Sequence, residues 1–94
     1  MGQEKKYSLK YHRLVSGEVV ALDSFWRGEI LRVIENKVLP RPDVFGKPLR
    51  QSLKGCRSVR VSDYRIVYRI ENRIIHVLAV IHRSNKYKGI ERRI

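Results

Sequence analysis

The sequence of 94 residues is poor in the features that mark secreted and metal-binding proteins. It has a single cysteine, Cys56, so no internal disulfide can form and nothing suggests an oxidising compartment. Its histidines at positions 12, 76 and 82 have no spacing with Cys56 that resembles a zinc site. We therefore expect no metal and no other cofactor.

Long hydrophobic runs are also missing. No apolar run approaches the roughly 20 residues that a helix needs to cross a bilayer, and residues 1–6 lack the apolar stretch of a signal peptide. We expect a cytoplasmic protein that has no membrane partner. The apolar fraction of 43% is ordinary for a globular protein, and this length predicts a single domain over residues 1–94.

Acidic residues are scarce, with nine Asp and Glu against 21 Lys and Arg, which gives a net charge of +12. Such a field repels a second copy of the chain, so we expect a monomer, and it attracts polyanions. Nucleic acid, an anionic membrane surface and an acidic protein are the candidate partners. The membrane is the weakest of these, because the chain has no long apolar segment.

What the chain does have is an alternation of apolar and basic residues over residues 57–70, typical of half-buried strands. Ser62-Asp63 interrupts the alternation and predicts the turn of a hairpin. A two-residue turn pairs Arg60 with Arg65 across the strands, and like charges in such a pair destabilise a sheet. This arrangement suits an anion-binding face, although a solvated outer face is the commoner reason for arginines on strands.

The remaining elements follow from periodicity. Residues 5–15 alternate as a first strand, a short helix follows from residue 16, and a second helix begins at Asp23 or Ser24 and stops before Pro40. Residues 74–81 are apolar on both faces, which predicts a central strand, and residues 89–94 form a short basic tail. The predicted fold is α+β. A small antiparallel sheet of about four strands carries a helical pair on one face, in the order β-α-α-β-β-β, and its other face is left for a ligand.

The familiar catalytic motifs are absent: no Gly-rich phosphate loop, serine nucleophile motif or carboxylate pair occurs. Basic and aromatic side chains converge instead where strands end, namely Arg65, His82, Arg83, Lys86 and Tyr87. This set suits RNA cleavage, because RNA carries its own nucleophile and cleavage then needs a base, an acid and cations around the phosphate. Each residue also has an ordinary structural alternative: Tyr87 can pack on the sheet, Arg83 can pair with an acid, and His82 can bond to backbone.

Four stretches occur in an order typical of one family. They are FGKPL at 45–49, LKG at 53–55, RVSDYRIVY at 60–68, and His82-Arg83 with Tyr87 after a hydrophobic strand. In these stretches the chain resembles the RelE/ParE superfamily of bacterial toxins from type II toxin–antitoxin systems, over residues from about 6 to 88. The resemblance implies a cognate acidic antitoxin as partner. The RelE branch of the family cleaves messenger RNA, usually on the ribosome, by attack of the 2′-hydroxyl and without metal.

The resemblance also implies residue roles. Arg65 would stabilise the phosphate, Arg83 would act as acid or as a further positive charge, and Tyr87 would be the base or orient the nucleophile. His82 could share the proton transfer. We predict that five neighbouring basic residues bind the RNA: Lys54, Arg57, Arg60, Lys86 and Lys88.

One departure from the family pattern concerns Cys56 and Ser58, which stand where RelE carries two lysines on the strand before the hairpin turn. The ParE branch shares the scaffold, lacks the nuclease site and poisons DNA gyrase. The retained Tyr87 and the His82-Arg83 pair favour cleavage over gyrase binding. A non-catalytic RNA-binding domain of the same fold is a third possibility.

Overall fold

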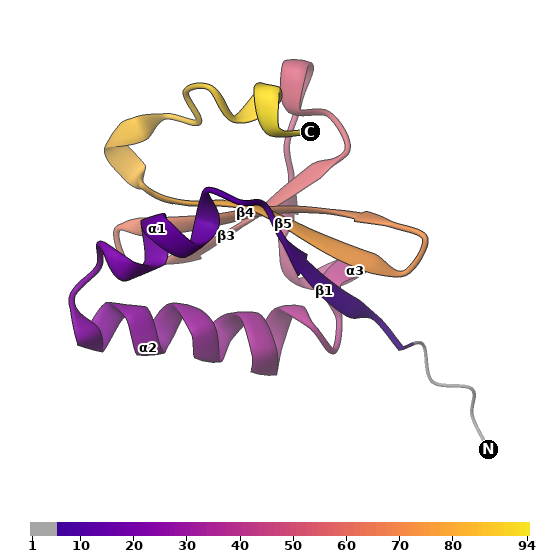
Figure 1. Ribbon diagram of the computed structural model, residues 1–94. Helices are drawn as coiled ribbons and strands as arrows, with labels where there is room; N and C mark the ends of the chain where they lie inside the picture. The colour runs from indigo at the N-terminus through magenta and orange to yellow at the C-terminus, as the bar shows by residue number, and fades with distance from the viewer. Residues whose placement is uncertain (1–5) are drawn as a thin grey trace.

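The computed structural model describes residues 6–94, and in this part of the chain one mixed sheet lies between two layers of helical segments (Figure 1). The strands described there are five, in the order β1-β5-β4-β3-β2. Their bounds are β1 (Ser8–Tyr11), β2 (Lys47–Pro48), β3 (Cys56–Val61), β4 (Tyr64–Glu71) and β5 (Ile74–His82). The α+β class is thus confirmed, with a sheet one strand larger than predicted.

The helical segments are mostly short. They are α1 (Val15–Val20), α2 (Ser24–Val33), the π-helical turn η1 (Ile34–Val38), α3 (Pro42–Phe45), and the 3₁₀ turns η2 (Gln51–Leu53), η3 (Arg83–Asn85) and η4 (Ile90–Arg93). The side chain of Asp23 accepts a hydrogen bond from the Trp26 N–H, 3.1 Å away, and so caps α2 as predicted. No helix within residues 6–94 is long and apolar enough to cross a membrane.

Two strands differ from the prediction. The first strand covers Ser8–Tyr11 only, while Lys5 lies outside the described residues. It pairs in parallel with β5, so the sheet is mixed rather than antiparallel. A parallel pair needs a long connection, which the helices and the hairpin between β1 and β5 supply. The fifth strand, β2, has two residues and lies antiparallel to β3.

The hairpin register is the predicted one. Arg60 lies opposite Arg65, and Val61 lies opposite Tyr64. The turn residue Ser62 has a φ of +56°. Because paired residues point to the same face, both arginines project from one side of the sheet.

The central strand β5 is covered on both faces, as its apolar sequence predicted. On one face Ile75 and Val77 pack in a buried cluster that includes Ile30 and Ile34 from the α2–η1 helix. A β-bulge in the pairing of β4 with β5 leaves Leu78 as an extra residue, after which the alternation of β5 is shifted. Ile34 and Val77 are fully buried, and this cluster is the larger of the two that pack on the sheet.

The opposite face is not left wholly open, because residues 89–94, predicted as a short basic tail, fold back against it. Ile90 of η4 is 1% exposed and joins Val67, Leu78 and Ile81 in a second buried cluster. Figure 1 shows the C-terminal segment lying on the side of the sheet opposite α2. Burial of one isoleucine contributes about 2 kcal/mol, which favours the packing of this short segment against the sheet. The space left for a ligand is the part of this face that the tail does not cover.

Candidate functional site

The candidate site lies on the face of the sheet opposite α2, at the end where the hairpin turns. Arg65 on β4 is opposite Ile81 on β5 and Arg60 on β3, so these side chains share that face. Ser58 lies two residues before Arg60 on β3 and faces the same way, since it pairs with Val67 of the second cluster. The alternation of β3 and β4 therefore places two arginines and a serine side by side.

The C-terminal segment supplies the opposite wall. After His82 the chain forms η3, and Lys86 and Tyr87 then adopt left-handed backbone conformations, with φ of +56° and +64°. This turns the Tyr87 ring back over the sheet, where it packs against the second cluster. Its hydroxyl donates a hydrogen bond to Ser58 Oγ, 3.1 Å away.

Two adjoining cavities result. The first has a volume of about 200 Å³ and is lined by Arg65, Ile81, His82, Arg83, Lys86 and Tyr87. The second has about 430 Å³ and is lined by Phe45, Lys47, Pro48, Leu49, Ser58, Val59, Arg60, Arg65 and Tyr87. Because Arg65 and Tyr87 line both, we treat the two as one basic groove, defined by Lys47, Arg60, Arg65, Arg83, Lys86 and Tyr87.

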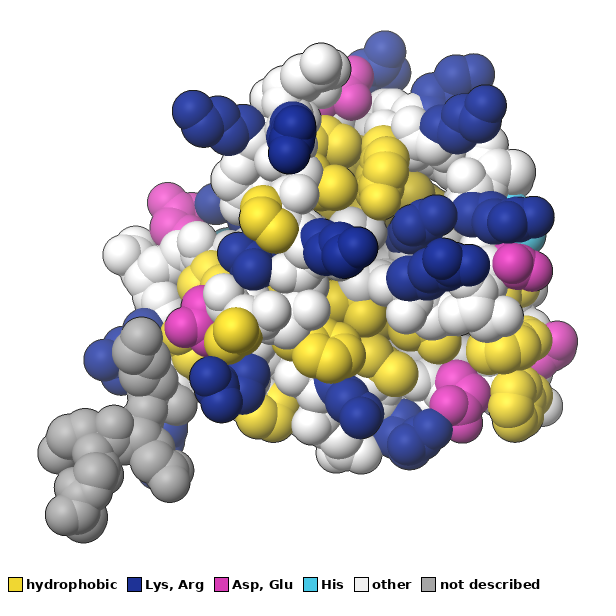
Figure 2. Space-filling view, turned by 180° about the vertical axis from the view of Figure 1, so that it is seen from behind, with side chains coloured by type: hydrophobic (Ala, Val, Ile, Leu, Met, Phe, Trp, Pro, Cys, Tyr) yellow, Lys and Arg dark blue, Asp and Glu magenta, His cyan; other side chains and the backbone are white. Residues whose placement is uncertain are grey.

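The charge of the basic groove is unbalanced. None of the residues that line its two cavities is acidic. One groove residue does contact a carboxylate: Arg83 Nε lies 3.6 Å from Asp63 Oδ1, and both side chains are more than half exposed. Such an exposed pair is weak, so Arg83 remains available to a ligand. Figure 2 shows Lys and Arg side chains crowded in a band across this view of the molecule.

His82 lies at the rim of the groove. Its Nδ1 accepts a hydrogen bond from the Ser84 N–H, 3.1 Å away, which assigns the proton of a neutral ring to Nε2. The ring packs edge-on against Tyr64, with 5.6 Å between ring centroids, and Tyr64 in turn lies 5.9 Å from Trp26. His82 thus connects the groove with the N-terminal end of α2.

Three of the predicted RNA-binding residues line neither cavity. Arg57 lies opposite Tyr68 and Pro48, which puts it on the other face from Arg60, and its Nε donates to the Gly46 carbonyl at 2.9 Å. Lys54 and Lys88 are exposed outside the groove. Arg60 and Lys86 do line it, together with the four predicted catalytic residues.

Two polar residues that line the groove were missed by the sequence analysis. Ser58 is 9% exposed and accepts a hydrogen bond from the Tyr87 hydroxyl. It lies two residues before Arg60 on the same strand and so points to the same face, which was the signal in the sequence that could have revealed it. Lys47 reaches the groove through the pairing of β2 with β3, for which the sequence offers no local signal. Cys56, the other position of departure, is 1% exposed; burial raises the pKa of its thiol, and nearby Arg69 partly offsets this.

No group of three His, Cys, Asp or Glu side chains within residues 6–94 is placed to hold a metal ion. The chemistry that the groove itself offers is that of guanidinium, ammonium, imidazole and phenol groups. Such groups bind a phosphate and can exchange protons with its ester oxygens.

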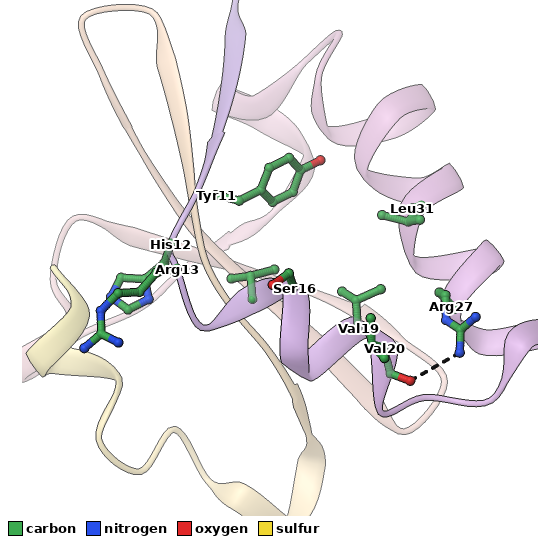
Figure 3. A pocket seen from close by; sticks show the side chains of 9 residues that line it. Tyr11, His12, Arg13, Ser16, Val19, Val20, Arg27 and Leu31 are labelled. Atoms are coloured by element: carbon green, nitrogen blue, oxygen red, sulfur yellow. Dashed lines mark hydrogen bonds between the residues drawn. The ribbon is translucent and has the colours of Figure 1, made fainter.

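A larger hollow of about 490 Å³ lies elsewhere, between α1 and α2 beside the end of β1. Figure 3 shows its walls, in which Val19, Val20 and Leu31 give an apolar surface and Arg27 lies at one side. The Arg27 guanidinium is already engaged, because it donates to the carbonyls of Val20 and Leu22. This hollow therefore lacks the concentration of free charge that marks the basic groove.

Comparison with known proteins identifies relatives over most of the chain. Residues 9–87 match the family described as the ParE toxin of the type II toxin–antitoxin system parDE. Toxin RelG of Mycobacterium tuberculosis is 34% identical over 79 residues, which cover 82% of this chain and 82% of that toxin. Toxin RelE of the same organism is 38% identical over 53 residues, which cover 54% of this chain and about half of the relative, 55%.

Solved structures agree on the fold. The toxin–antitoxin complex RelBE2 of Mycobacterium tuberculosis contains a chain with a TM-score of 0.75 and 25% identity, over 82% of this chain and 98% of that one. A mutant of toxin RelE from E. coli, in the free state, has a TM-score of 0.74 and 20% identity, over 94% of this chain and 93% of that one.

Proposed function

This chain belongs to the RelE/ParE superfamily of type II toxin–antitoxin toxins, and from that premise we propose that it is an endoribonuclease that cleaves messenger RNA. The observation that carries the proposal is the gathering of Arg65, Arg83 and Tyr87 around one cavity. They come from two segments of the chain and meet on one face of the sheet, where no carboxylate lines the cavity.

In the proposed reaction the 2′-oxygen attacks the adjacent phosphorus while the bond from phosphorus to the 5′-oxygen breaks. The products are a 2′,3′-cyclic phosphate and a 5′-hydroxyl. Arg65 lies at the centre of the basic groove and would donate to the phosphate oxygens as negative charge builds on them. A guanidinium suits this task because its planar fork contacts two oxygens at once.

The proton steps fall to the C-terminal wall of the groove. Tyr87, held by Ser58, would accept the 2′-hydroxyl proton in its phenolate form or, as the phenol, orient the 2′-hydroxyl, and the leaving 5′-oxygen would take up a proton from Arg83 or His82. Imidazole can both donate and accept near neutral pH, and the Nε2 proton of His82 is not engaged by the Ser84 contact. Lys86 adds positive charge to the same cavity.

The substrate class follows from charge. A chain with a net charge of +12 binds RNA through release of counterions, so its affinity falls as salt rises. This attraction is independent of sequence. Selection of the cleavage site would then depend on how a ribosome, or an unstacked base, presents the message in the cytoplasm.

The proposed protein partner is an acidic antitoxin. Two similar solved structures are toxin–antitoxin complexes, RelBE2 and DinJ-YafQ. An acidic chain laid over the basic groove would neutralise its field and associate rapidly, because opposite charges steer the encounter.

The experiment that tests the proposal expresses the chain from a tightly repressed promoter and maps the 5′ ends of cellular transcripts. New ends inside coding regions are expected with the unaltered chain and absent with Tyr87→Phe and with Arg83→Ala. Arg92→Ala is the matched control, because Arg92 is exposed in η4 and outside the groove. A Tyr87→Phe chain that produces the same ends at the same rate would contradict the proposed role of the tyrosine.

A second candidate function is inhibition of DNA gyrase, favoured by the match to the ParE family over residues 9–87. The same expression experiment separates the two. Gyrase-linked DNA breaks in cells whose transcripts remain intact would support this candidate and exclude the nuclease.

A further inference from the structure

The strand β5 loses its neighbour partway along one edge. Strand β1 pairs with it up to Tyr11 opposite Val77, and the His12 N–H donates to the Val77 carbonyl at 2.9 Å. The chain then turns away into α1. The backbone groups of β5 beyond Val77 on this edge therefore need other partners, because buried peptide groups left unpaired are costly.

Two side chains provide those partners. Glu18 of α1 accepts a hydrogen bond from the Val80 N–H through Oε1, at 3.0 Å. Arg93 of η4 donates to the Leu78 carbonyl at 3.0 Å. The two side chains also contact each other, with 2.8 Å between Arg93 Nη1 and Glu18 Oε2, and they are only 17% and 22% exposed. An acceptor and a donor thus occupy the positions that a further strand would fill.

The Glu18–Arg93 pair fixes the far end of the C-terminal segment. This segment begins at His82, where β5 ends, and carries Arg83, Lys86 and Tyr87 along its length. Between these residues and Arg93 lies Ile90, which is buried in the second cluster together with the Tyr87 ring. The segment is consequently held at both ends and in the middle.

The backbone conformation of the segment explains why it needs to be held in place. Lys86 and Tyr87 are consecutive non-glycine residues with positive φ. Such a backbone conformation is unfavourable for residues that carry a Cβ and persists only when surrounding contacts enforce it. The Tyr87 contact with Ser58 is one such contact, but it is a single hydrogen bond between side chains. Release of the C-terminal end would let the backbone relax and move Tyr87 away from Arg65.

We propose that Glu18 and Arg93 are positioning residues of the basic groove, which act through η4 to hold Tyr87 and Arg83 over the sheet. The expected effect on RNA cleavage rests on the proposed endoribonuclease function. The expected effect on the structure of the C-terminal segment does not. Neither residue lines the groove, and Glu18 lies 62 positions before the Val80 N–H that it accepts from.

The test compares Arg93→Ala, Glu18→Ala and the double variant with Arg92→Ala, which removes the same charge from the exposed neighbouring position. Amide hydrogen exchange of the full chain is measured first. We expect faster exchange in residues 83–93 of Arg93→Ala and Glu18→Ala, and outside this segment only at the Val80 N–H, which loses its acceptor in Glu18→Ala. We expect no additional effect on residues 83–93 in the double variant, and no change in Arg92→Ala. Exchange that rises equally in the hairpin of β3 and β4 would overturn the inference, since the pair would then stabilise the fold as a whole.

Cleavage of an RNA oligonucleotide is measured second. Displacement of catalytic groups by about 1 Å can slow a reaction by up to about a hundredfold. We expect kcat to fall by at least about tenfold in Arg93→Ala while KM changes by less than about twofold, because Lys47, Arg60 and Arg65 on the sheet still hold the RNA. Equal rates in Arg93→Ala and Arg92→Ala would overturn the inference. A parent chain that cleaves no RNA would refute the proposed function, and the exchange experiment would still decide whether the pair holds the segment.

Discussion

The Tyr87 hydroxyl donates a hydrogen bond to Ser58 Oγ and so joins the C-terminal segment to β3, 29 positions earlier in the chain. Ser58 is 9% exposed and the bond is part-buried. The contact fixes the phenol oxygen beside β3, in a cavity that Arg60 and Arg65 also line. It is therefore the contact by which the sheet controls the orientation of the proposed base.

Ser58→Ala removes the partner of the tyrosine but keeps the tyrosine itself. We expect a loss of about 1 kcal/mol in the free energy of unfolding, the usual value for one hydrogen bond, and a cleavage rate reduced by about tenfold because the phenol is less well oriented. Tyr87→Phe should lose the same stability and nearly all cleavage. Urea unfolding and single-turnover cleavage measure the two effects. Equal cleavage rates in Ser58→Ala and the parent would contradict the orienting role.

Arg65→Ala and Arg57→Ala form a matched pair, since each removes one arginine from the same hairpin. Arg65 lines both cavities, whereas Arg57 lies on the other face and donates to the Gly46 carbonyl. We expect Arg65→Ala to abolish cleavage with little change in stability. Arg57→Ala should retain cleavage and lose about 1 to 2 kcal/mol, because a charged donor to a carbonyl is removed. Both effects are measured by the same two assays. If Arg57→Ala abolished cleavage and Arg65→Ala retained it, the phosphate would bind on the face of the sheet that carries Arg57, contrary to the proposal.

Tyr68 provides a stability test on the face of the sheet opposite the groove. Its buried hydroxyl accepts from the Gly46 N–H at 3.0 Å and donates to the Pro42 carbonyl at 2.8 Å. A Cβ at position 46 would lie 2.6 Å from this hydroxyl. We expect Gly46→Ala and Tyr68→Phe each to cost about 2 kcal/mol in thermal or urea unfolding.

Gly28→Ala is the control for the substitution at position 46. Gly28 lies in α2, and an added Cβ there meets nothing within 4 Å. Alanine favours a helix over glycine, so this variant should gain roughly 0.5 to 1 kcal/mol. A Gly46→Ala chain as stable as Gly28→Ala would show that α3 can move away from Tyr68 without cost.

Because the Cys56 thiol is buried, we expect the free energy of unfolding to fall in alkaline solution. Burial raises its pKa above the ordinary value of 9.0. Above that value the unfolded chain loses the thiol proton while the folded chain keeps it, so the free energy of unfolding falls as pH rises, until the folded thiol also ionises. Burial of Tyr11 and Tyr68 raises their pKa too and adds the same trend at higher pH. Urea unfolding between about pH 8.5 and 10.5 should show a shallower decline in Cys56→Ala. Identical slopes would mean that the thiol ionises equally in both states.

Trp26 offers a direct reporter of RNA binding, because it is the only tryptophan in the sequence. Its ring lies 5.9 Å from that of Tyr64, which contacts His82 at the rim of the groove. A 2′-deoxy oligonucleotide, which carries no nucleophile, should change the Trp26 fluorescence, and its affinity should fall steeply with salt concentration. Arg60→Ala should reduce the slope of this salt dependence. Binding that is insensitive to salt would contradict the phosphate-based interaction.

Several features of the fold were determined by the sequence alone. The register of Arg60 with Arg65 follows from alternation and a two-residue turn, both of which depend on neighbours in the chain. The same local logic predicted that residues 74–81 form a central strand and that basic and aromatic groups gather beyond its end. Even the face on which Arg57 lies was encoded, because Arg57 is three positions before Arg60 and residues an odd number of positions apart on a strand point to opposite faces.

Other features were decided only by tertiary structure. No sequence pattern near Lys47-Pro48 predicts a fifth strand, and none in residues 89–94 predicts that Ile90 is buried. In the sequence Glu18 looks like an ordinary charged residue of a helix. Only the folded structure shows that the Val80 N–H and Arg93 lie beside it. Local patterns determine which face of an element is apolar, since that depends on residues a few positions apart. Which distant groups complete an unpaired strand edge depends on the packing of the whole chain.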